Sequence, residues 1–246
     1  MGSSLVSAAH PYLDKEQRKI QGLFDSIAPR YDFLNHALSF ELDRWWRRKA
    51  VVELRPRAGG VYLDACCGTG DLAFALERAG GRELPLRVIG ADFSLGMLRR
   101  AARKGSGAGS PRFLAGDTLR LPFADRSFDG AAVAFGIRNV QDLDGGLREL
   151  ARVVRPGGRV VILEFTPISV PVFGPLFNFY LERILPRIGN CISGSGERAY
   201  SYLNDSIRRW PDGEALADRL RGAGMCAVRW RKLFPGNVAV HAGIRR

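Results

Sequence analysis

The stretch Leu63-Asp-Ala-Cys-Cys-Gly-Thr-Gly-Asp-Leu-Ala73 places two glycines between an apolar run and an amphipathic run. Glycines there permit a tight turn and let a ligand approach the backbone closely. The spacing Gly68-x-Gly70-x-x-Ala73 also matches the dinucleotide-binding fingerprint. The loop therefore predicts a nucleotide-like ligand on a strand-loop-helix unit, without selecting which one.

Carboxylates on both sides of this turn indicate the charge of the ligand. Asp64 closes the apolar run before the loop, and Asp71 stands where the helix begins. A pyrophosphate binds the bare, positive N-terminus of a helix, and a carboxylate at that place opposes it. The two acids therefore favour a cationic ligand such as S-adenosylmethionine, which carries an ammonium and a sulfonium group, over a dinucleotide.

Two further acids end strand-like runs later in the chain. Asp92 follows Gly70 by 22 residues and closes residues 86–92, and Asp117 closes residues 112–117. Because parallel strands end at one edge of a sheet, both carboxylates are expected beside the glycine loop. Asp92 is placed to accept both ribose hydroxyls of a nucleoside, and Asp117 to reach its adenine edge. Acids that only cap helices are the alternative, which several acids at one edge disfavour.

Strand-like and helix-like runs alternate from residue 60 onward, which predicts parallel strands joined by crossover helices. The expected fold is α/β: a doubly wound, Rossmann-like, seven-stranded sheet that is mostly parallel and has one antiparallel strand. The expected strands are residues 60–64, 86–92, 112–117, 128–135, 159–165, 227–234 and 238–244, the last two joined as a hairpin by Pro235-Gly-Asn237.

The organisation of the chain follows from these runs. Residues 1–54 are predicted to be a loose tail and a helical cap, and residues 55–246 the ligand-binding domain. An aromatic-rich, helical insertion at about 167–207 interrupts the alternation before the last strands and is expected to bind the substrate. The length of 246 residues suits one structural domain.

Composition limits the classes of partner. The chain carries 37 Lys and Arg against 25 Asp and Glu, a net charge of +12, which favours an anionic partner, although the charges are dispersed. The four cysteines include no Cys-x-x-Cys pair, so neither a zinc site, another metal site nor a disulfide framework is predicted. The uncharged stretch 165–181 contains three prolines and is too short to span a bilayer. A cytoplasmic protein is expected.

Motifs along the chain resemble known families. Four stretches resemble the class I S-adenosylmethionine-dependent methyltransferases: residues 64–73, Asp92-Phe-Ser94, residues 116–129, and residues 152–158 with their Pro-Gly-Gly. Residues 24–35, Phe135-Gly-Ile-Arg-Asn139 and parts of residues 185–203 resemble the narrower ubiquinone/menaquinone biosynthesis C-methyltransferase family. This resemblance runs from about Gln21 to Gly243.

The resemblance implies S-adenosylmethionine as the cofactor. The cofactor-binding residues it implies are Asp64, Gly68, Thr69, Gly70, Asp92, Phe93, Asp117, Thr118 and Ala134. Ala134 stands where the family has Ser, so its contact would come from the backbone alone. Asn204 and Trp210 also depart from the expected Pro and Phe, and no motif needed for methyl transfer is lost.

The activity that the resemblance implies is C-methylation of a polyprenylated quinol, most directly of demethylmenaquinol to menaquinol. Methylation of 2-methoxy-6-polyprenyl-1,4-benzoquinol is the alternative. The reacting ring carbon lies beside a hydroxyl group that loses its proton, so the site must orient the ring and stabilise a phenolate. Arg138 is predicted to stabilise this phenolate, Asn139 to bind a quinol oxygen, and Tyr31 to orient or deprotonate the quinol. The alternatives are a surface Arg, a turn Asn and a Tyr that only anchors the cap.

The substrate also predicts partners. Phe177, Tyr200 and Tyr202 are expected to line its pocket, with plain packing as the alternative. A polyprenyl tail partitions into lipid, so peripheral contact with the inner face of the cell membrane is expected. Apolar residues 173–180 followed by Arg183 and Arg187 suit that contact. No nucleic acid partner is predicted, and a homodimer is left open.

Other functions on the same fold are the rivals. A methyltransferase acting on another phenol or a polyketide would share every cofactor motif. An RNA methyltransferase would suit the positive charge, but the chain shows neither an appended RNA-binding motif nor a continuous basic stripe. A protein that binds the cofactor without turnover is disfavoured by the intact residues 64–70, Asp92 and Arg138.

Overall fold

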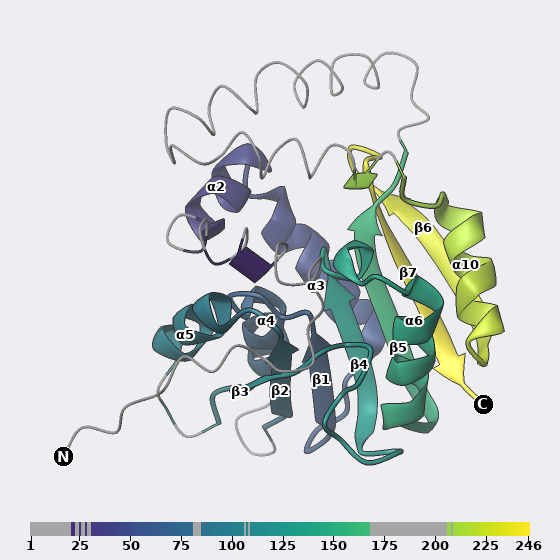
Figure 1. Cartoon of the computed structure of the whole chain (residues 1–246), viewed down its shortest axis with the longest axis horizontal. Helices are drawn as coiled ribbons and strands as arrows, with labels where there is room; N and C mark the ends of the chain where they lie inside the picture. Colours follow the sequence, from purple (N-terminus) through teal and green to yellow (C-terminus); the bar gives the residue numbers. More distant parts are fainter. Residues whose placement is uncertain are drawn as a thin grey trace.

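A central seven-stranded sheet organises the molecule (Figure 1). The computed structural model describes residues 21–22, 25, 28, 31–80, 85–105, 107, 109–167, 206–207 and 209–246. The strands are β1 (Val61–Ala65), β2 (Arg87–Asp92), β3 (Arg112–Ala115), β4 (Phe128–Ala134), β5 (Val154–Phe165), β6 (Met225–Leu233) and β7 (Val238–Arg245). Their order in the sheet is β3-β2-β1-β4-β5-β7-β6.

The strand directions confirm the predicted sheet. Strands β1 to β5 pair in parallel, and β7 inserts antiparallel between β5 and β6. The chain runs outward from β1 to β3 and then crosses back to β4 on the other side of β1. This reversal makes the carboxyl ends of β1 and β4 a switch point, where ligands bind in open α/β sheets.

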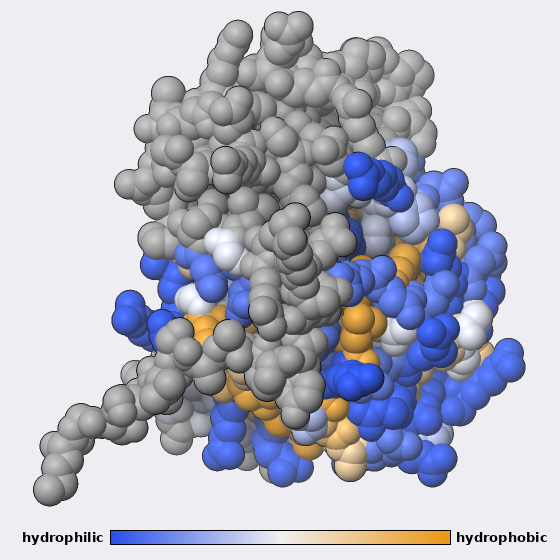
Figure 2. All heavy atoms as spheres, in the orientation of Figure 1, coloured by the Kyte–Doolittle hydropathy of each residue, from blue (hydrophilic) through white to orange (hydrophobic). Residues whose placement is uncertain are grey.

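Helices cover both faces of the sheet. The helices are α2 (Tyr31–Leu38), α3 (Leu42–Leu54), α4 (Asp71–Ala79), α5 (Leu95–Lys104), α6 (Leu143–Val153) and α10 (Gly213–Gly222), with a 3₁₀ turn η2 (Ile137–Asn139). Helices α6 and α10 lie on the near face in Figure 1, and α3 passes behind the sheet. The near face, seen in Figure 2, is mainly hydrophilic over α6 and α10.

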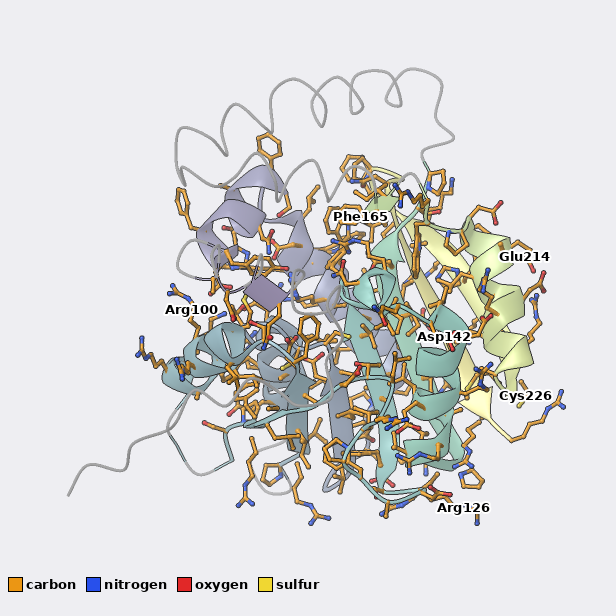
Figure 3. The ribbon with its side chains drawn as sticks, in the orientation of Figure 1. Arg100, Arg126, Asp142, Phe165, Glu214 and Cys226 are labelled. Atoms are coloured by element: carbon orange, nitrogen blue, oxygen red, sulfur yellow. The ribbon has the colours of Figure 1, made fainter. Side chains whose placement is uncertain are left out.

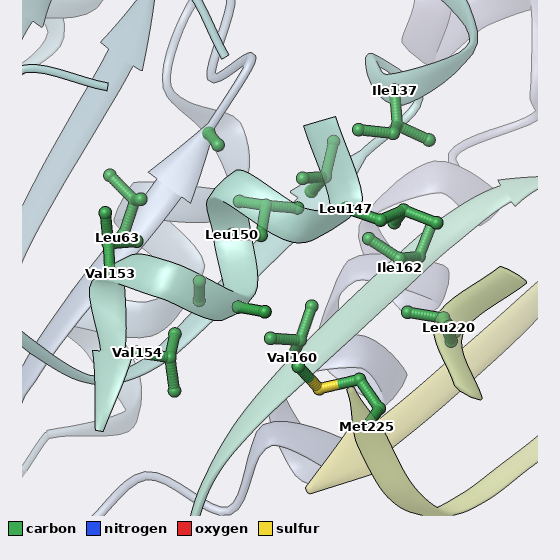
Figure 4. Close-up of a cluster of buried hydrophobic side chains, with 14 of the residues drawn as sticks. Leu63, Ile137, Leu147, Leu150, Val153, Val154, Val160, Ile162, Leu220 and Met225 are labelled. Carbon is green, nitrogen blue, oxygen red and sulfur yellow. The ribbon is translucent and has the colours of Figure 1, made fainter. Parts of the chain in front are cut away.

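Two apolar layers hold this arrangement together. Ile162 faces the α6 and α10 side, and its neighbour Leu163 faces the α3 and α4 side, because successive strand residues point to opposite faces. Figure 4 shows the first layer, where Leu147 and Leu150 of α6 pack onto β5. Both strand residues are fully buried, which is typical of a sheet covered on both sides.

Several element boundaries differ from the prediction. Strand β3 ends at Ala115, so Asp117 lies in the following turn. Strand β5 begins at Val154 instead of residue 159, because Val154 pairs with Phe128 across a register shift. The N-terminal helical region divides into α2 and α3 where Phe40 and Glu41 adopt left-handed backbone angles.

Side-chain caps fix the starts of three helices, α5, α6 and α10. Ser94 accepts the Met97 N–H at the start of α5, as its position in the sequence predicted. Asp142 and Asp212 cap α6 and α10 in the same way. No helix in the described part of the chain is long and apolar enough to span a bilayer.

Candidate active site

A cavity opens at the carboxyl-terminal edge of the sheet, beside the switch point. Its walls come from the β1–α4 loop, from the ends of β2 and β4 and from helices α2 and α3. The predicted site residues that line it are Tyr31, Asp64, Gly68, Thr69, Asp92, Phe93, Ala134 and Asn139. The fold therefore brings predicted cofactor residues and predicted catalytic residues to one cavity.

The glycine loop owes its shape to two left-handed backbone angles. Gly68 has a φ of +54° and Gly70, which caps α4, has a φ of +84°. A Cβ atom on Gly70 would lie 2.7 Å from the Phe113 ring, so a side chain there is excluded. A Cβ atom on Gly68 would meet nothing within 4 Å, and the backbone there is open to the cavity.

Asp92 joins the glycine loop to the end of β2. One carboxylate oxygen accepts the Gly68 N–H at 2.8 Å, and the other accepts the Ser94 N–H at 2.8 Å. Burial raises the pKa of Asp92 to about 6, against the lowering effect of these two N–H donors. Each oxygen keeps a second lone pair, so the carboxylate can also accept hydroxyl groups of a ligand.

Asp64 presents an unsatisfied oxygen at the site. The residue is 1% exposed, and its Oδ2 accepts the Ala73 N–H at 2.8 Å, which fastens the start of α4. Its Oδ1 finds no hydrogen-bond partner among the described residues, and burial raises its pKa well above the usual value. An unpaired buried carboxylate is costly, so a positive group reaching it would be stabilised. The residues present thus fit S-adenosylmethionine, a cation.

Asp71 attracts a cationic ligand less than its position in the sequence suggests. It begins α4 and lines the cavity, but Lys104 Nζ lies 2.7 Å from its Oδ1 and Arg47 Nη2 3.7 Å from its Oδ2. Burial raises the pKa of Asp71, yet Arg47 and Lys104 outweigh burial and hold the pKa below its usual value. The protein's own cations therefore compensate this carboxylate.

Arg47 is a cavity residue that the sequence analysis missed. It is buried on α3, pairs with Asp43 one turn earlier, and lies 5.6 Å from the centre of the Phe135 ring. His36 Nδ1 lies 2.8 Å from the same Asp43 carboxylate, which joins α2 to α3. His36, Asp43 and Asp71 are close enough to hold a metal ion, but Arg47 already pairs with both carboxylates. The four-residue spacing of Asp43 and Arg47 was the available signal.

The turn after β4 separates its two predicted catalytic residues. Asn139 lines the cavity at the end of η2. Arg138 does not line it: its Nη1 donates to Glu164 Oε1 at 2.6 Å and to the Phe135 carbonyl oxygen at 2.8 Å. Its guanidinium lies 5.2 Å from the centre of the ring of Phe165, which Figure 3 labels at the end of β5. Arg138 thus braces the turn from behind the cavity wall.

Tyr31 reaches the cavity from the first turn of α2. Burial raises the pKa of its hydroxyl, while a hydrogen bond with Asn35 and the charges of Arg138 and Arg47 act in the opposite direction. The hydroxyl group therefore lies within electrostatic reach of both arginines and stays protonated at neutral pH.

The remaining predicted residues lie off the cavity wall or outside the described residues. Gly70 shapes the loop without lining the cavity. Thr118 is buried, with its Oγ1 3.1 Å from Cys66 Sγ, and Asp117 accepts the Leu119 N–H within its own turn. Phe177, Tyr200 and Tyr202 fall outside the residues that the structure describes.

Solved structures that are named as methyltransferases share this architecture. A SAM-dependent methyltransferase from Thermotoga maritima matches with a TM-score of 0.66 at 20% identity, over 92% of this chain and 100% of that chain. A Haemonchus contortus phosphoethanolamine N-methyltransferase, solved with S-adenosyl-L-methionine, matches with a TM-score of 0.59 at 15% identity, over 82% of this chain and 52% of that one. Such distant likenesses establish the Rossmann-like fold, as predicted.

Two demethylmenaquinone methyltransferases are much more similar to this chain in sequence than those solved structures are. The demethylmenaquinone methyltransferase of Mycobacterium marinum is 45% identical over 237 residues, covering 95% of this chain and 96% of that protein. The demethylmenaquinone methyltransferase of Corynebacterium kroppenstedtii is 40% identical over 237 residues, covering 96% of this chain and 99% of that protein.

The family match spans almost the whole chain, including the cap, the cavity and the last strands. It covers residues 12–245 and carries the description ubiE/COQ5 methyltransferase family. The match confirms the predicted resemblance, the predicted class of enzyme and S-adenosylmethionine as the predicted cofactor. The chain belongs to the ubiE/COQ5 methyltransferase family.

Proposed function

We propose that this enzyme transfers a methyl group from S-adenosylmethionine to a ring carbon of demethylmenaquinol, which yields menaquinol. The observation that carries the proposal is the shared cavity, where Asp64 and Asp92 border the same space as Tyr31 and Asn139. The names of the relatives from Mycobacterium marinum and Corynebacterium kroppenstedtii support a naphthoquinol as the acceptor.

The cofactor side of the cavity is the wall formed by β1, β2 and the glycine loop. Asp92 would accept the ribose hydroxyls, and Asp64 would compensate the positive methionine end beside the Gly68 and Thr69 backbone. Bound there, S-adenosylmethionine supplies an electrophilic methyl group on a positive sulfur. Thr69 Oγ1 donates to Asp32 of α2, so the cap is tied to the loop that holds the cofactor. The cofactor roles of Phe93, Asp117, Thr118 and Ala134 stay predictions.

The acceptor side of the cavity is the wall formed by α2, α3 and η2. Asn139 would bind one quinol oxygen, and the protonated Tyr31 hydroxyl group would donate a hydrogen bond to the same oxygen. Among the described residues, Arg47 is the cation that lines this space, and a cation beside a phenolic hydroxyl group lowers the pKa of that group. The hydroxyl proton passes to water, and the resulting phenolate makes the neighbouring ring carbon nucleophilic. A buried cation stabilises the developing negative charge strongly.

Arg138 would act on this chemistry by positioning. Its contacts go to Glu164, to the Phe135 carbonyl oxygen and to the Phe165 ring. These contacts fix the backbone that presents Asn139 to the cavity. The positive charge of Arg138 also reaches the Tyr31 hydroxyl without contact.

The benzoquinol is the second candidate substrate, because the family description joins ubiE with COQ5. Peripheral membrane contact through residues 173–187 lies outside the described residues. That contact, a place at the inner face of the membrane and a homodimer stay predictions.

A methyl-transfer assay tests the proposal. Detergent-dispersed, reduced demethylmenaquinol and reduced 2-methoxy-6-polyprenyl-1,4-benzoquinol are offered separately with labelled S-adenosylmethionine. Label in the naphthoquinol is the expected result, and label in both quinols identifies an enzyme that serves both pathways. Cofactor binding without label in either quinol would overturn the substrate assignment while leaving the family intact.

A further inference from the structure

The outer side of α3 combines exposed cations with exposed apolar side chains. Arg44 and Arg48 are exposed there, together with Trp45 (36% exposed) and Val52 (64%), while Lys49 Nζ lies 5.2 Å from the centre of the Trp45 ring. At 3.6 residues per turn, these five side chains fall within an arc of about 140°. The opposite side of α3 is buried against the sheet, so the mixed face is the one that meets solvent.

Apolar exposure continues beyond the N-terminal end of this helix. Phe40 is 79% exposed in the turn between α2 and α3, and Phe33 on α2 is 66% exposed. Large apolar side chains exposed together with cations mark an interaction surface more specifically than single exposed residues do.

Cations also outnumber acids at the C-terminal end of α3, although Glu41 pairs with Arg44 at 2.9 Å near its N-terminal end. Glu53 receives both Arg229 at 2.8 Å and Arg231 at 3.3 Å, so two cations share one carboxylate. The pKa of Arg159 is lowered by burial and then by the charges of Arg55, Arg229 and Arg57, which places further cations nearby.

A groove beside α3 links this face to the catalytic cavity. Arg44 and Arg48 line it from α3, Arg78 from α4 and Lys104 from α5, above an apolar floor that includes Val51 and Phe74. Arg47 and Asp71 line both the groove and the cavity. A molecule lying on the α3 face would thus be adjacent to the proposed site of methyl transfer.

We infer that the outer face of α3 docks on a bilayer that contains anionic phospholipids, with Arg44, Arg48 and Arg78 at the headgroup phosphates. Lys and Arg strengthen binding to an anionic surface, and Trp and aliphatic side chains among them enter the boundary between headgroups and acyl chains. A nucleic acid would engage the cations but leave Val52 and Phe40 in water. The inference rests on the proposed function, because a tail-bearing quinol gives the docking its purpose.

The test is sedimentation of the full chain with vesicles in the absence of substrate. Vesicles of phosphatidylcholine with phosphatidylglycerol should bind the protein, vesicles of phosphatidylcholine alone should bind it at least tenfold more weakly, and added salt should weaken binding. Arg44→Glu/Arg48→Glu should reduce binding at least tenfold, and Trp45→Ala should reduce it several-fold. Equal binding to both vesicles, or binding to RNA but not to either vesicle, would overturn the inference.

A matched variant separates the α3 face from net charge. Arg148→Glu/Arg219→Glu makes the same change in charge on α6 and α10. Both arginines are exposed and pair with Asp142 and Asp144, as Arg44 pairs with Glu41. This variant should retain vesicle binding, and an equal loss in both variants would count against the α3 face. All variants should methylate a water-soluble demethylmenaquinol without the long tail at the wild-type rate. Failure of wild type in that assay would refute the proposed function without altering the vesicle result.

Discussion

At the scale of a single residue, we expect Asp92 to make cofactor binding depend on pH. The residue is 7% exposed, and burial raises the pKa of its carboxyl group to about 6. Hydrogen bonds from ribose hydroxyls require the ionised carboxylate, so binding below pH 6 must release the proton. We expect the affinity for S-adenosylhomocysteine to rise about tenfold per pH unit up to pH 6 and to level off above it. Isothermal titration calorimetry from pH 5 to 7.5 measures this dependence.

The Asp92→Asn variant provides the comparison. It should bind S-adenosylhomocysteine weakly at every pH, and its affinity should not rise between pH 5 and pH 6. Asp218→Asn, which changes an exposed acid on α10, should keep both the affinity and the step. Wild-type affinity that is constant between pH 5 and 7 would refute the role given to Asp92.

Arg138 and Glu164 form a buried ion pair behind the wall of the cavity. If Arg138 acts by positioning Asn139, its partner Glu164 matters to turnover as well. We expect Arg138→Ala and Glu164→Gln to lower kcat by about 10- to 100-fold while cofactor affinity stays within about twofold. Arg138→Ala also leaves a buried carboxylate unpaired, at a cost of about 3–5 kcal/mol in stability.

Steady-state kinetics and calorimetry on the same preparations separate these effects. Glu164→Gln is nearly isosteric, so it keeps the fold comparable with wild type. Full activity of Glu164→Gln beside an inactive Arg138→Ala would show that Arg138 contacts the substrate directly and that positioning is the wrong description.

The turn after β4 sets the geometry of the site at the scale of an element. Phe135 and Cys66 both adopt left-handed backbone angles although neither is glycine, and the loops that carry them meet at Gly136. A Cβ atom on Gly136 would lie 2.3 Å from Cys66 Cβ, so the two loops approach as closely as backbones allow.

Gly136→Ala should therefore separate the loops, lower the melting temperature and weaken binding of S-adenosylhomocysteine by at least about tenfold. Cys66→Gly in the same chain removes the opposing Cβ and suits the positive φ, and it should restore part of the affinity. Gly222→Ala is the control, because open space surrounds that helical position, and it should stabilise the protein slightly. Unchanged cofactor affinity in Gly136→Ala would contradict the tight contact.

The unit formed by β6, β7 and α10 is expected to be acid-sensitive through His241. The ring stacks on Trp230, and its Nε2 lies 2.8 Å from the Gly213 carbonyl oxygen, while Nδ1 has no partner among the described residues. Burial lowers the pKa of His241 to about 4, so the unfolded chain takes up a proton near pH 6.5 that the folded chain rejects. This contribution to stability is complete above pH 6.5 and is lost as the pH falls toward 4.

Urea unfolding of wild type and His241→Gln at pH 7 and pH 5 measures this effect. Between pH 7 and pH 5, the free energy of unfolding of wild type should fall by about 2 kcal/mol more than that of the variant. Other titrating groups, Asp92 among them, are common to both proteins, so the difference isolates His241. Equal losses in the two proteins would refute the assignment.

The fold of the whole molecule was open to prediction because its signals are local and repeated. Apolar runs that end in Asp64 and Asp92 identify two strands, and a Ser at position 94 identifies a helix start. The site was only partly predictable. A pattern of charges such as Asp43 and Arg47 resembles a solvated helix face, and only the packing of α3 against the sheet buries it.

The same limit applies to Arg138. Its place after β4 predicted a cation at the switch point, and the cation is there. Whether it faces the cavity depends on Glu164, which lies 26 positions later in the chain and meets it only in the folded sheet. Long-range pairing of buried charges leaves no periodic trace in the sequence.

At the scale of the whole molecule, we propose that the cavity at the switch point holds both reactants. Its cofactor wall belongs to the sheet domain, and its acceptor wall is completed by the cap helices α2 and α3. Asp32 and Lys104 tie these parts together at 2.8 Å. The cavity is therefore a property of the assembled chain.

The most direct test is a structure of the enzyme with S-adenosylhomocysteine and a demethylmenaquinol that carries a short tail. We expect the ribose on Asp92 and the quinol ring between Tyr31, Asn139 and Arg47, with the acceptor carbon facing the cofactor sulfur. A ring bound outside this cavity, or a cofactor that leaves Asp92 and Asp64 without contact, would contradict it.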